Sequence, residues 1–314
     1  SGMSRQPTGL ILTGKSISVR WKLLPGATVD MGRSHRMSMR PPVLRRVFTS
    51  LVLAAVGLPA IIYGGLFYYL LMTVFLVGAA WEYIRLFRAV HYEPNEILTI
   101  GGVLVVATAR FFFVDIAIPA LVLLVLLAMT AHLFAFERGR EQAALDFGVT
   151  TTCIVYVGWL GSYLLDLRSL PDGVWWWLLV LSVVWAGDIG AYSIGAVYGK
   201  HKMTPRLSPK KSWEGYFAGV LTSVLIGAFL AYAFSSLGPQ PLRGLIDPIR
   251  GGLLGLVIGM LTPLGDLGES MLKRQGGLKD SSNVFPGHGG FLDRIDSWIW
   301  GAVIGYLIIQ YSLL

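Results

Sequence analysis

Long apolar stretches separated by short polar segments dominate the chain from about residue 47 to its end. About nine of these stretches have the length of roughly 20 residues that a helix needs to cross about 30 Å of hydrocarbon. They lie at residues 47–64, 66–87, 97–114, 116–136, 146–165, 174–198, 214–235, 249–272 and 292–313. Helices of soluble proteins rarely stay apolar for so long, because one face must meet water. The pattern therefore predicts an all-α, polytopic membrane protein with about nine transmembrane helices.

Composition and the placement of charge agree with this fold class. The 314 residues are 54% hydrophobic and 14% charged, and the mean hydropathy is +0.62. The net charge of +8 arises in the first 46 residues, which hold nine Lys and Arg against one acidic residue, Asp30. Beyond them 17 basic and 17 acidic residues balance, so the body of the chain lacks a basic surface for a nucleic-acid backbone. We therefore expect no nucleic-acid partner.

The N-terminal segment and the connections between apolar stretches predict how the protein lies in the membrane. Residues 1–40 show no sustained periodicity, so we expect a disordered leader or an extension foreign to the natural chain. Lys and Arg concentrate in the cytoplasmic connections of membrane proteins. The connections richest in them carry Arg85, Arg88, Arg138, Arg140, Lys200, Lys202, Arg206, Lys210, Lys211, Lys273, Arg274 and Lys279. This asymmetry predicts a cytoplasmic N-terminus and charged cytoplasmic connections after the sixth and eighth spans.

Ionisable residues divide the chain into two predicted regions. Residues 41–170, with about five helices, carry few of them and are expected to form a transmembrane scaffold. Residues 171–314, with about four helices, are expected to hold the catalytic groups. Within the scaffold, Glu82 and Arg85 are three residues apart and are interpreted as a local interfacial ion pair. The single cysteine, Cys153, is expected to pack in the core.

The sixth predicted span carries an acidic residue in a stripe of small and aromatic residues. Four residues spaced i, i+4, i+7 and i+11 share one helical face, namely Asp188, Tyr192, Gly195 and Gly199. A charged side chain is costly in lipid, so this face must meet protein or water. A close helix–helix interface and a polar pocket both meet that requirement.

The connection after the sixth span is rich in cations and contains two prolines. Its basic residues are Lys200, Lys202, Arg206, Lys210 and Lys211. Ammonium groups act as point charges on phosphate oxygens, so beside an intramembrane aspartate the segment favours a polyphosphate ligand over an ordinary positive-inside connection. Ser212 is expected to cap the next helix, and Glu214 lies in its first turn, where the helix dipole favours an anion.

The most informative stretch is LTPLGDLGESMLKRQGGLKDSSNVFPGHGGFLDRIDSWIWG, residues 261–301. One helical face near its start carries Asp266, Glu269, Ser270 and Lys273, and the last predicted span begins with the similarly spaced Asp293, Asp296 and Ser297. Two helices thus offer carboxylate oxygens to a common space, and hard oxygen ligands suit Mg²⁺. Glycines in the intervening loop allow backbone N–H groups to approach an anion. The structural alternative is a set of mutually neutralised ion pairs.

The run from Ser270 to Asp296 resembles the signature of phosphatidate cytidylyltransferases, also called CDP-diacylglycerol synthases. The matching positions are Ser270, Lys273, Arg274, Lys279, Asp280, Ser282, Phe285, Pro286, His288, Gly289, Gly290, Asp293, Arg294 and Asp296. Upstream the resemblance extends to Asp188, Tyr192, Gly199, Lys200, Ser208, Pro209, Lys210, Lys211, Glu214 and Gly215. It implies transfer of CMP from CTP to phosphatidic acid, giving CDP-diacylglycerol and pyrophosphate, with Mg²⁺ as cofactor. It also implies a homodimer in the bacterial inner membrane.

The resemblance further implies roles for individual residues. The expected metal ligands are Asp266 and Asp293, with Asp296 and Glu269 as ligands or their neighbours, and with room for a second cation, K⁺ or Mg²⁺. The expected catalytic residues are Asp266, Asp293, Asp296 and Lys273. Phosphate contacts are expected from Lys273, Arg274, Lys210 and Lys211. Other substrate contacts are expected from Asp188, Tyr192, Lys200, Ser208, Glu214, Lys279, Asp280, His288 and Arg294.

Two other classes of membrane protein share some of these features. A secondary transporter or channel also contains intramembrane charges, but they are expected deep in several spans, whereas here they gather at one end of spans six, eight and nine. A CDP-alcohol phosphotransferase also uses aspartates, yet the chain contains no D-G-x-x-A-R segment. Both patterns favour the cytidylyltransferase interpretation.

Overall fold

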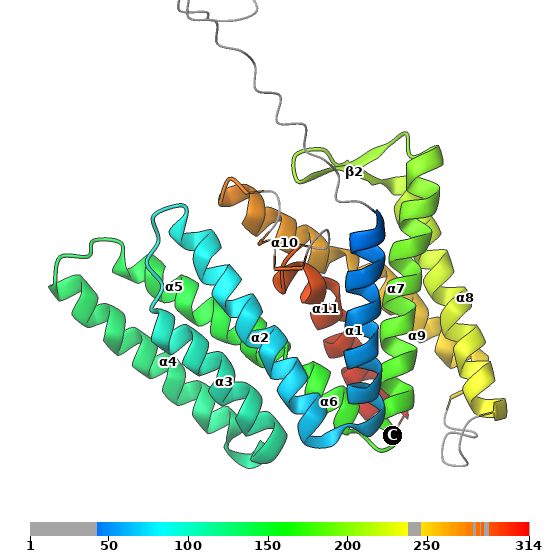
Figure 1. Ribbon diagram of the computed structural model, residues 1–314, viewed down its shortest axis with the longest axis horizontal. Coiled ribbons are helices and arrows are strands. Elements are labelled where there is room, and N and C mark those ends of the chain that lie inside the picture. Colours follow the sequence, from blue (N-terminus) through cyan, green and yellow to red (C-terminus); the bar gives the residue numbers. More distant parts are fainter. Residues whose placement is uncertain (1–42, 238–245, 279–280, 283, 286–288, 314) are drawn as a thin grey trace, which may run out of the picture. The chain divides into compact units, whose positions relative to one another are not determined.

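Helices form almost all of the structure, a computed structural model that describes residues 43–237, 246–278, 281–282, 284–285 and 289–313 (Figure 1). The predicted leader, residues 1–40, lies outside these described residues. The first helices are α1 (Val43–Tyr63), α2 (Gly65–Arg88), α3 (Glu96–Phe112), α4 (Val114–Glu137), α5 (Ala143–Cys153), the π-helix η1 (Ile154–Leu160) and α6 (Tyr163–Ser169). They are followed by α7 (Gly173–Tyr198), β1 (Lys202–Thr204), β2 (Ser208–Ser212), α8 (Trp213–Leu237), α9 (Pro248–Leu261), α10 (Pro263–Gln275), α11 (Leu292–Ile308) and the π-helix η3 (Ile309–Leu313).

Among the described residues, six helical segments are long and apolar enough to cross a membrane by length and composition. They are Gly65–Arg88, Val114–Glu137, Ala143–Ser169, Gly173–Tyr198, Trp213–Ser236 and Pro248–Gln275. The prediction of an all-α membrane protein is therefore confirmed. The number of about nine spans, the cytoplasmic N-terminus and the division at residue 170 stay predictions.

Two of the predicted spans are divided into shorter helices. The stretch predicted at 249–272 forms α9 and α10, which meet at Pro263. Proline has no N–H to donate and is favoured in the first turn of a helix, so α10 begins there as a separate polar helix. The stretch predicted at 146–165 is likewise divided into α5, η1 and α6.

A short β-hairpin replaces the irregular connection expected after the sixth span. Strands β1 and β2 are antiparallel, with Lys202 opposite Ser212 and Thr204 opposite Ser208. Glu214 closes the hairpin because its carboxylate accepts the His201 backbone N–H at 3.1 Å and lies 2.6 Å from the His201 Nδ1. The predicted cap is confirmed, since the Ser212 Oγ accepts the Gly215 N–H at 3.2 Å.

Helix α11 lies at the centre of the packing. It contacts α2, α6, α7, α9 and α10, and Figure 1 shows it between α2 and α9. Its side chains Leu292, Ile295 and Ile299 are buried in the main hydrophobic core. The helix that carries Asp293 and Asp296 is thus supported by both predicted regions of the chain.

Glycines allow α7, α8 and α9 to pack at very short distance. A Cβ atom at Gly187 would lie 2.5 Å from the Ser223 Oγ, and one at Gly255 would overlap the Ser223 carbonyl oxygen. Such contacts are shorter than real Cβ atoms make. At Gly255 the close atoms belong to the backbone, so a side chain there requires the helices to separate, whereas at Gly187 the Ser223 side chain would have to move. These helices carry or adjoin most of the charged motifs.

Gly255→Ala is expected to destabilise the protein by about 1–3 kcal/mol, because overpacking forces α8 and α9 apart. Gly101→Ala in α3 is the matched control, since nothing lies within 4 Å of a Cβ atom there and alanine favours a helix. Thermal unfolding of the detergent-solubilised protein measures both. Equal midpoints for the two variants would contradict the packing argument.

Candidate active site

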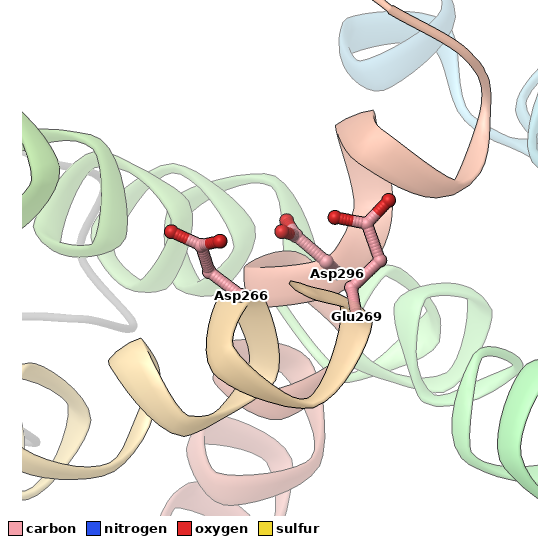
Figure 2. Close-up of side chains that lie close together, drawn as sticks. All are labelled: Asp266, Glu269 and Asp296. Carbon is pink, nitrogen blue, oxygen red and sulfur yellow. The ribbon is translucent and has the colours of Figure 1, made fainter. Parts of the chain in front are cut away.

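Carboxylates from two helices meet beside the β-hairpin. Asp266 and Glu269 of α10 and Asp296 of α11 offer oxygen atoms that all lie within 4.8 Å of one another, and Figure 2 shows the three side chains reaching into the same space. A Cβ atom at Gly265 would lie 2.6 Å from the Asp296 carbonyl oxygen and 2.7 Å from the Trp300 ring. The missing side chain at Gly265 therefore allows the close approach of α10 and α11.

The donor chemistry of this cluster fits a divalent cation. Glu269 is only 2% exposed, and its Oε2 accepts a hydrogen bond from the Lys273 Nζ at 2.7 Å. Its Oε1 is buried and has no hydrogen-bond partner among the described residues. A buried oxygen without a partner is costly, and a hard cation is a suitable partner for it. The three residues are thus able to hold Mg²⁺.

Asp293 is connected to this cluster through the side chain of Lys273. The Lys273 Nζ is 2.7 Å from the Glu269 Oε2 and 2.6 Å from the Asp293 Oδ1, so the ammonium joins the two carboxylates. The other oxygen of Asp293 accepts hydrogen bonds from the Ser281 N–H at 3.1 Å, the Ser281 Oγ at 2.6 Å and the Gly290 N–H at 2.8 Å. Asp293 therefore holds Ser281 and Gly290 in the connection between α10 and α11, residues 276–291, which we call the signature loop. Its predicted role as a metal ligand stays a prediction.

A cavity of about 560 Å³ adjoins the cluster on the side of α7, α8 and the hairpin. All four residues of the predicted α7 stripe line it, namely Asp188, Tyr192, Gly195 and Gly199. Lys202, Lys210 and Lys211 line it from the hairpin. The Lys211 Nζ lies 2.7 Å from the Asp266 Oδ2, which connects the cations to the acidic cluster. The α7 stripe thus borders a cavity that contains charged groups, and it also packs closely against α8.

The other predicted substrate residues lie around this centre in different ways. Ser208 begins β2, and Glu214 is occupied with His201. Arg274 donates to the Leu207 carbonyl at 3.4 Å, which joins α10 to the hairpin. The Arg294 Nε is buried without a hydrogen-bond partner in the described part of the chain. Lys200 is exposed, and Lys279, Asp280 and His288 lie outside the described residues.

A larger cavity of about 1220 Å³ lies elsewhere, around the connection between α2 and α3. Salt bridges from Arg88 to Glu96 and from Arg140 to Glu93 cross this region. None of the predicted site residues lines it. Size alone therefore does not identify the functional cavity, and the chemistry favours the smaller one.

Glu82 of α2 is a residue that the sequence interpretation placed wrongly. It is 0% exposed and lies within hydrogen-bond distance of donors from Ser281, Ser282, Phe291 and Leu292, the last two at the start of α11. Arg85, its expected partner, instead lies 4.6 Å above the ring of Trp81. An acidic residue within an otherwise apolar helix was the available signal, since such a group requires buried donors.

Comparison with known proteins identifies the family. The chain matches the profile of the cytidylyltransferase family over residues 44–312. The chain belongs to this family. A phosphatidate cytidylyltransferase from Pseudomonas aeruginosa is 34% identical over 261 residues, which cover 81% of this chain and 92% of that protein. One from Synechocystis sp. is 29% identical over 302 residues, or 86% of this chain and 97% of that protein.

Family membership confirms the resemblance seen in residues 270–296 and, with it, an enzyme of the phosphatidate cytidylyltransferase class. A third relative, from Staphylococcus epidermidis, is 29% identical over 84% of this chain and 98% of its own length. The matches cover nearly all of these relatives, so they include the helices before α7 as well as the charged motifs. The transporter and CDP-alcohol phosphotransferase alternatives are set aside.

Lys273→Met is expected to destabilise the folded protein by about 3 kcal/mol, because it leaves two buried carboxylates without their shared cation. The side chain of Lys273 is 11% exposed, and those of Glu269 and Asp293 are 2% and 10% exposed. The exposed Lys210 provides the control variant Lys210→Met. Chemical or thermal unfolding in detergent compares them, and equal stability would refute the shared-cation role.

Proposed function

We propose that the protein transfers CMP from CTP to phosphatidic acid and releases CDP-diacylglycerol and pyrophosphate. The observation that carries this proposal is the 2.7 Å contact between Lys211 and Asp266. It joins a cation-lined cavity to a group of three carboxylates within 4.8 Å of one another. A nucleoside triphosphate needs both kinds of group, since its phosphates bind cations directly and bind metal ions that carboxylates hold. The names of the relatives supply the identity of the two substrates.

The proposed reaction needs no strong general base. A phosphate monoester is already an anion at neutral pH, so a lipid phosphate oxygen can attack the α-phosphorus of CTP directly. The new P–O bond forms as the bond from the α-phosphorus to the bridging oxygen of the β-phosphate breaks, and pyrophosphate leaves with that electron pair. Repulsion between the two anions is the main obstacle, so catalysis consists of in-line positioning and charge neutralisation.

The described residues supply groups for both tasks. Asp266, Glu269 and Asp296 would hold Mg²⁺, which would supply positive charge to the phosphate oxygens. Lys210 and Lys211 face the cavity and would bind the β and γ phosphates. Lys273 would hold the side chains of Glu269 and Asp293 in place.

Asp293 remains a proposed ligand on the strength of the resemblance. Its neighbouring position, joined to Glu269 through Lys273, is compatible with a second cation, K⁺ or Mg²⁺, beside the first. Asp188 and Tyr192 border the same cavity as Lys211 and would contact the nucleotide or order water near it.

The proposed setting is the bacterial inner membrane. The basic connections support a cytoplasmic active site, where CTP is available, and the lipid substrate would enter from the leaflet. We also propose, by resemblance, that the protein is a homodimer. Residues 41–170 would form its scaffold and residues 171–314 its catalytic region.

Purified protein supplied with labelled CTP, phosphatidic acid and Mg²⁺ is expected to form labelled CDP-diacylglycerol and pyrophosphate. Thin-layer chromatography measures the lipid product and a pyrophosphate assay measures the other product. The two are expected in equal amounts. Chelation of the divalent cation is expected to stop the reaction, and added Mg²⁺ to restore it. Absence of lipid-linked label with every divalent metal tested would refute the proposed function.

Asp266→Asn is expected to reduce turnover by more than about 100-fold, since it removes charge where the phosphates react. The side chain of Asp266 is 40% exposed, so its pair with Lys211 adds little stability and the variant should remain folded.

Asp296→Asn is expected to weaken Mn²⁺ binding, measured by electron paramagnetic resonance, by about 10-fold or more. Lys210→Met should bind Mn²⁺ normally; unchanged binding in Asp296→Asn would exclude Asp296 as a ligand.

A further inference from the structure

Four donor groups of one segment, more than 190 residues later in the chain, lie within hydrogen-bond distance of the buried carboxylate of Glu82. Its Oε1 accepts from the Ser282 Oγ at 2.5 Å and the Phe291 N–H at 2.9 Å. Its Oε2 accepts from the Ser281 Oγ at 2.8 Å and the Leu292 N–H at 2.8 Å. A single side chain of α2 thus holds both ends of the described part of residues 281–292.

These contacts provide the N-terminal cap that α11 lacks within its own sequence. The first N–H groups of a helix have no partner inside the helix, and Phe291, at the cap position, has no side-chain acceptor to offer. Glu82 accepts the N–H groups of Phe291 and Leu292 instead, and its negative charge is favoured at the positive end of the helix dipole. The direction and position of the first turn of α11 therefore depend on α2.

Neighbouring residues on the same face of α2 reinforce this contact. Phe75, Gly78 and Glu82 follow one another at i, i+3 and i+7. The Phe75 ring packs on the rings of Phe285 and Phe291, with centroids 5.9 Å and 5.4 Å away. A Cβ atom at Gly290 would overlap the Glu82 carboxylate. The fit between α2 and the loop is thus both polar and steric.

Ser281 connects Glu82 to Asp293 and so to the acidic cluster of the candidate active site. Its Oγ lies 2.8 Å from the Glu82 Oε2 and 2.6 Å from the Asp293 Oδ2, so the two carboxylates share its single hydroxyl proton. Asp293 is in turn 2.6 Å from the Lys273 Nζ, which binds Glu269 of the acidic cluster. A continuous series of hydrogen bonds therefore leads from α2 to the cluster.

From these contacts we infer that Glu82 is a positioning residue, which sets the signature loop and the first turn of α11 so that Asp293, Lys273 and Asp296 are held for reaction. It does not touch the cavity that would hold CTP. The inference rests on the proposed function for its effect on turnover, but its structural part can be tested independently.

Glu82→Gln is expected to lower kcat by about 10- to 100-fold, the effect of losing a group that orients metal ligands, because an amide offers one acceptor oxygen where four donors converge. Asp146→Asn is the matched control. Asp146 is also buried and accepts a backbone N–H, that of Glu93, at 2.7 Å, but it does not touch the signature loop. We expect comparable thermal stability for the two variants and a selective loss of kcat in Glu82→Gln. Equal loss of kcat in both would overturn the inference.

A second measurement does not require turnover. Val284 is 44% exposed, so Val284→Cys accepts a nitroxide spin label, whereas the natural Cys153 is fully buried. Glu82→Gln is expected to sharpen the spectrum of this label, and Asp146→Asn to leave it unchanged. A spectrum unaffected by Glu82→Gln would overturn the inference. If the unsubstituted protein shows no transferase activity but the spectrum responds as expected, the proposed function fails and the loop-positioning role stands.

Ser282→Ala keeps the inference testable if Glu82→Gln fails to fold. It removes one of the four hydrogen bonds and is expected to change kcat and the label spectrum in the same direction but by less. Where both variants fold, the double variant should be less impaired than the product of the single effects, because the two changes remove a shared interaction. Full multiplicativity, or a Ser282→Ala variant identical to the unsubstituted protein, would overturn it.

Discussion

Neutralising carboxylates that are removed from water is the constraint on which the rest of the structure depends. Glu82, Glu269 and Asp293 are buried or nearly so, and each would be costly without cations or N–H donors. The protein answers with different partners for each carboxylate. Lys273 serves Glu269 and Asp293, while the serines of the signature loop and the N-terminus of α11 serve Glu82. Loop, helix ends and acidic cluster are consequently one connected arrangement.

Helical periodicity explains why part of the site could be predicted from sequence. Residues at i, i+3 and i+4 share a face whatever the rest of the fold does, so the grouping of Asp266 with Glu269 and the α7 stripe required no knowledge of tertiary structure. The contact of α10 with α11 was also accessible, because the two helices follow one another in the chain and both carry charged residues near their connection. The proline at the start of α10 could have indicated the break in the eighth predicted span.

Long-range partners explain what could not be predicted. Glu82 and Phe291 are 209 residues apart, and local spacing offered Arg85 as a partner instead, although Arg85 stacks on Trp81. The hairpin was missed because its strands have three and five residues and a polar composition without clear alternation. The grouping of Asp296, and not Asp293, with Asp266 and Glu269 depends on how α11 is rotated, which its own sequence does not determine.

Two adjacent glycines in the signature loop have a consequence for how such loops are interpreted. A methyl group at Gly289, where φ is +80°, would lie 2.5 Å from the Asp293 carboxylate, and one at Gly290 would overlap that of Glu82. The absence of side chains here is therefore already required by two acidic neighbours of the protein itself. Glycines beside a phosphate-binding site can thus be required because the protein's own carboxylates lie close to the main chain. This requirement is separate from any approach of a bound nucleotide to the main chain.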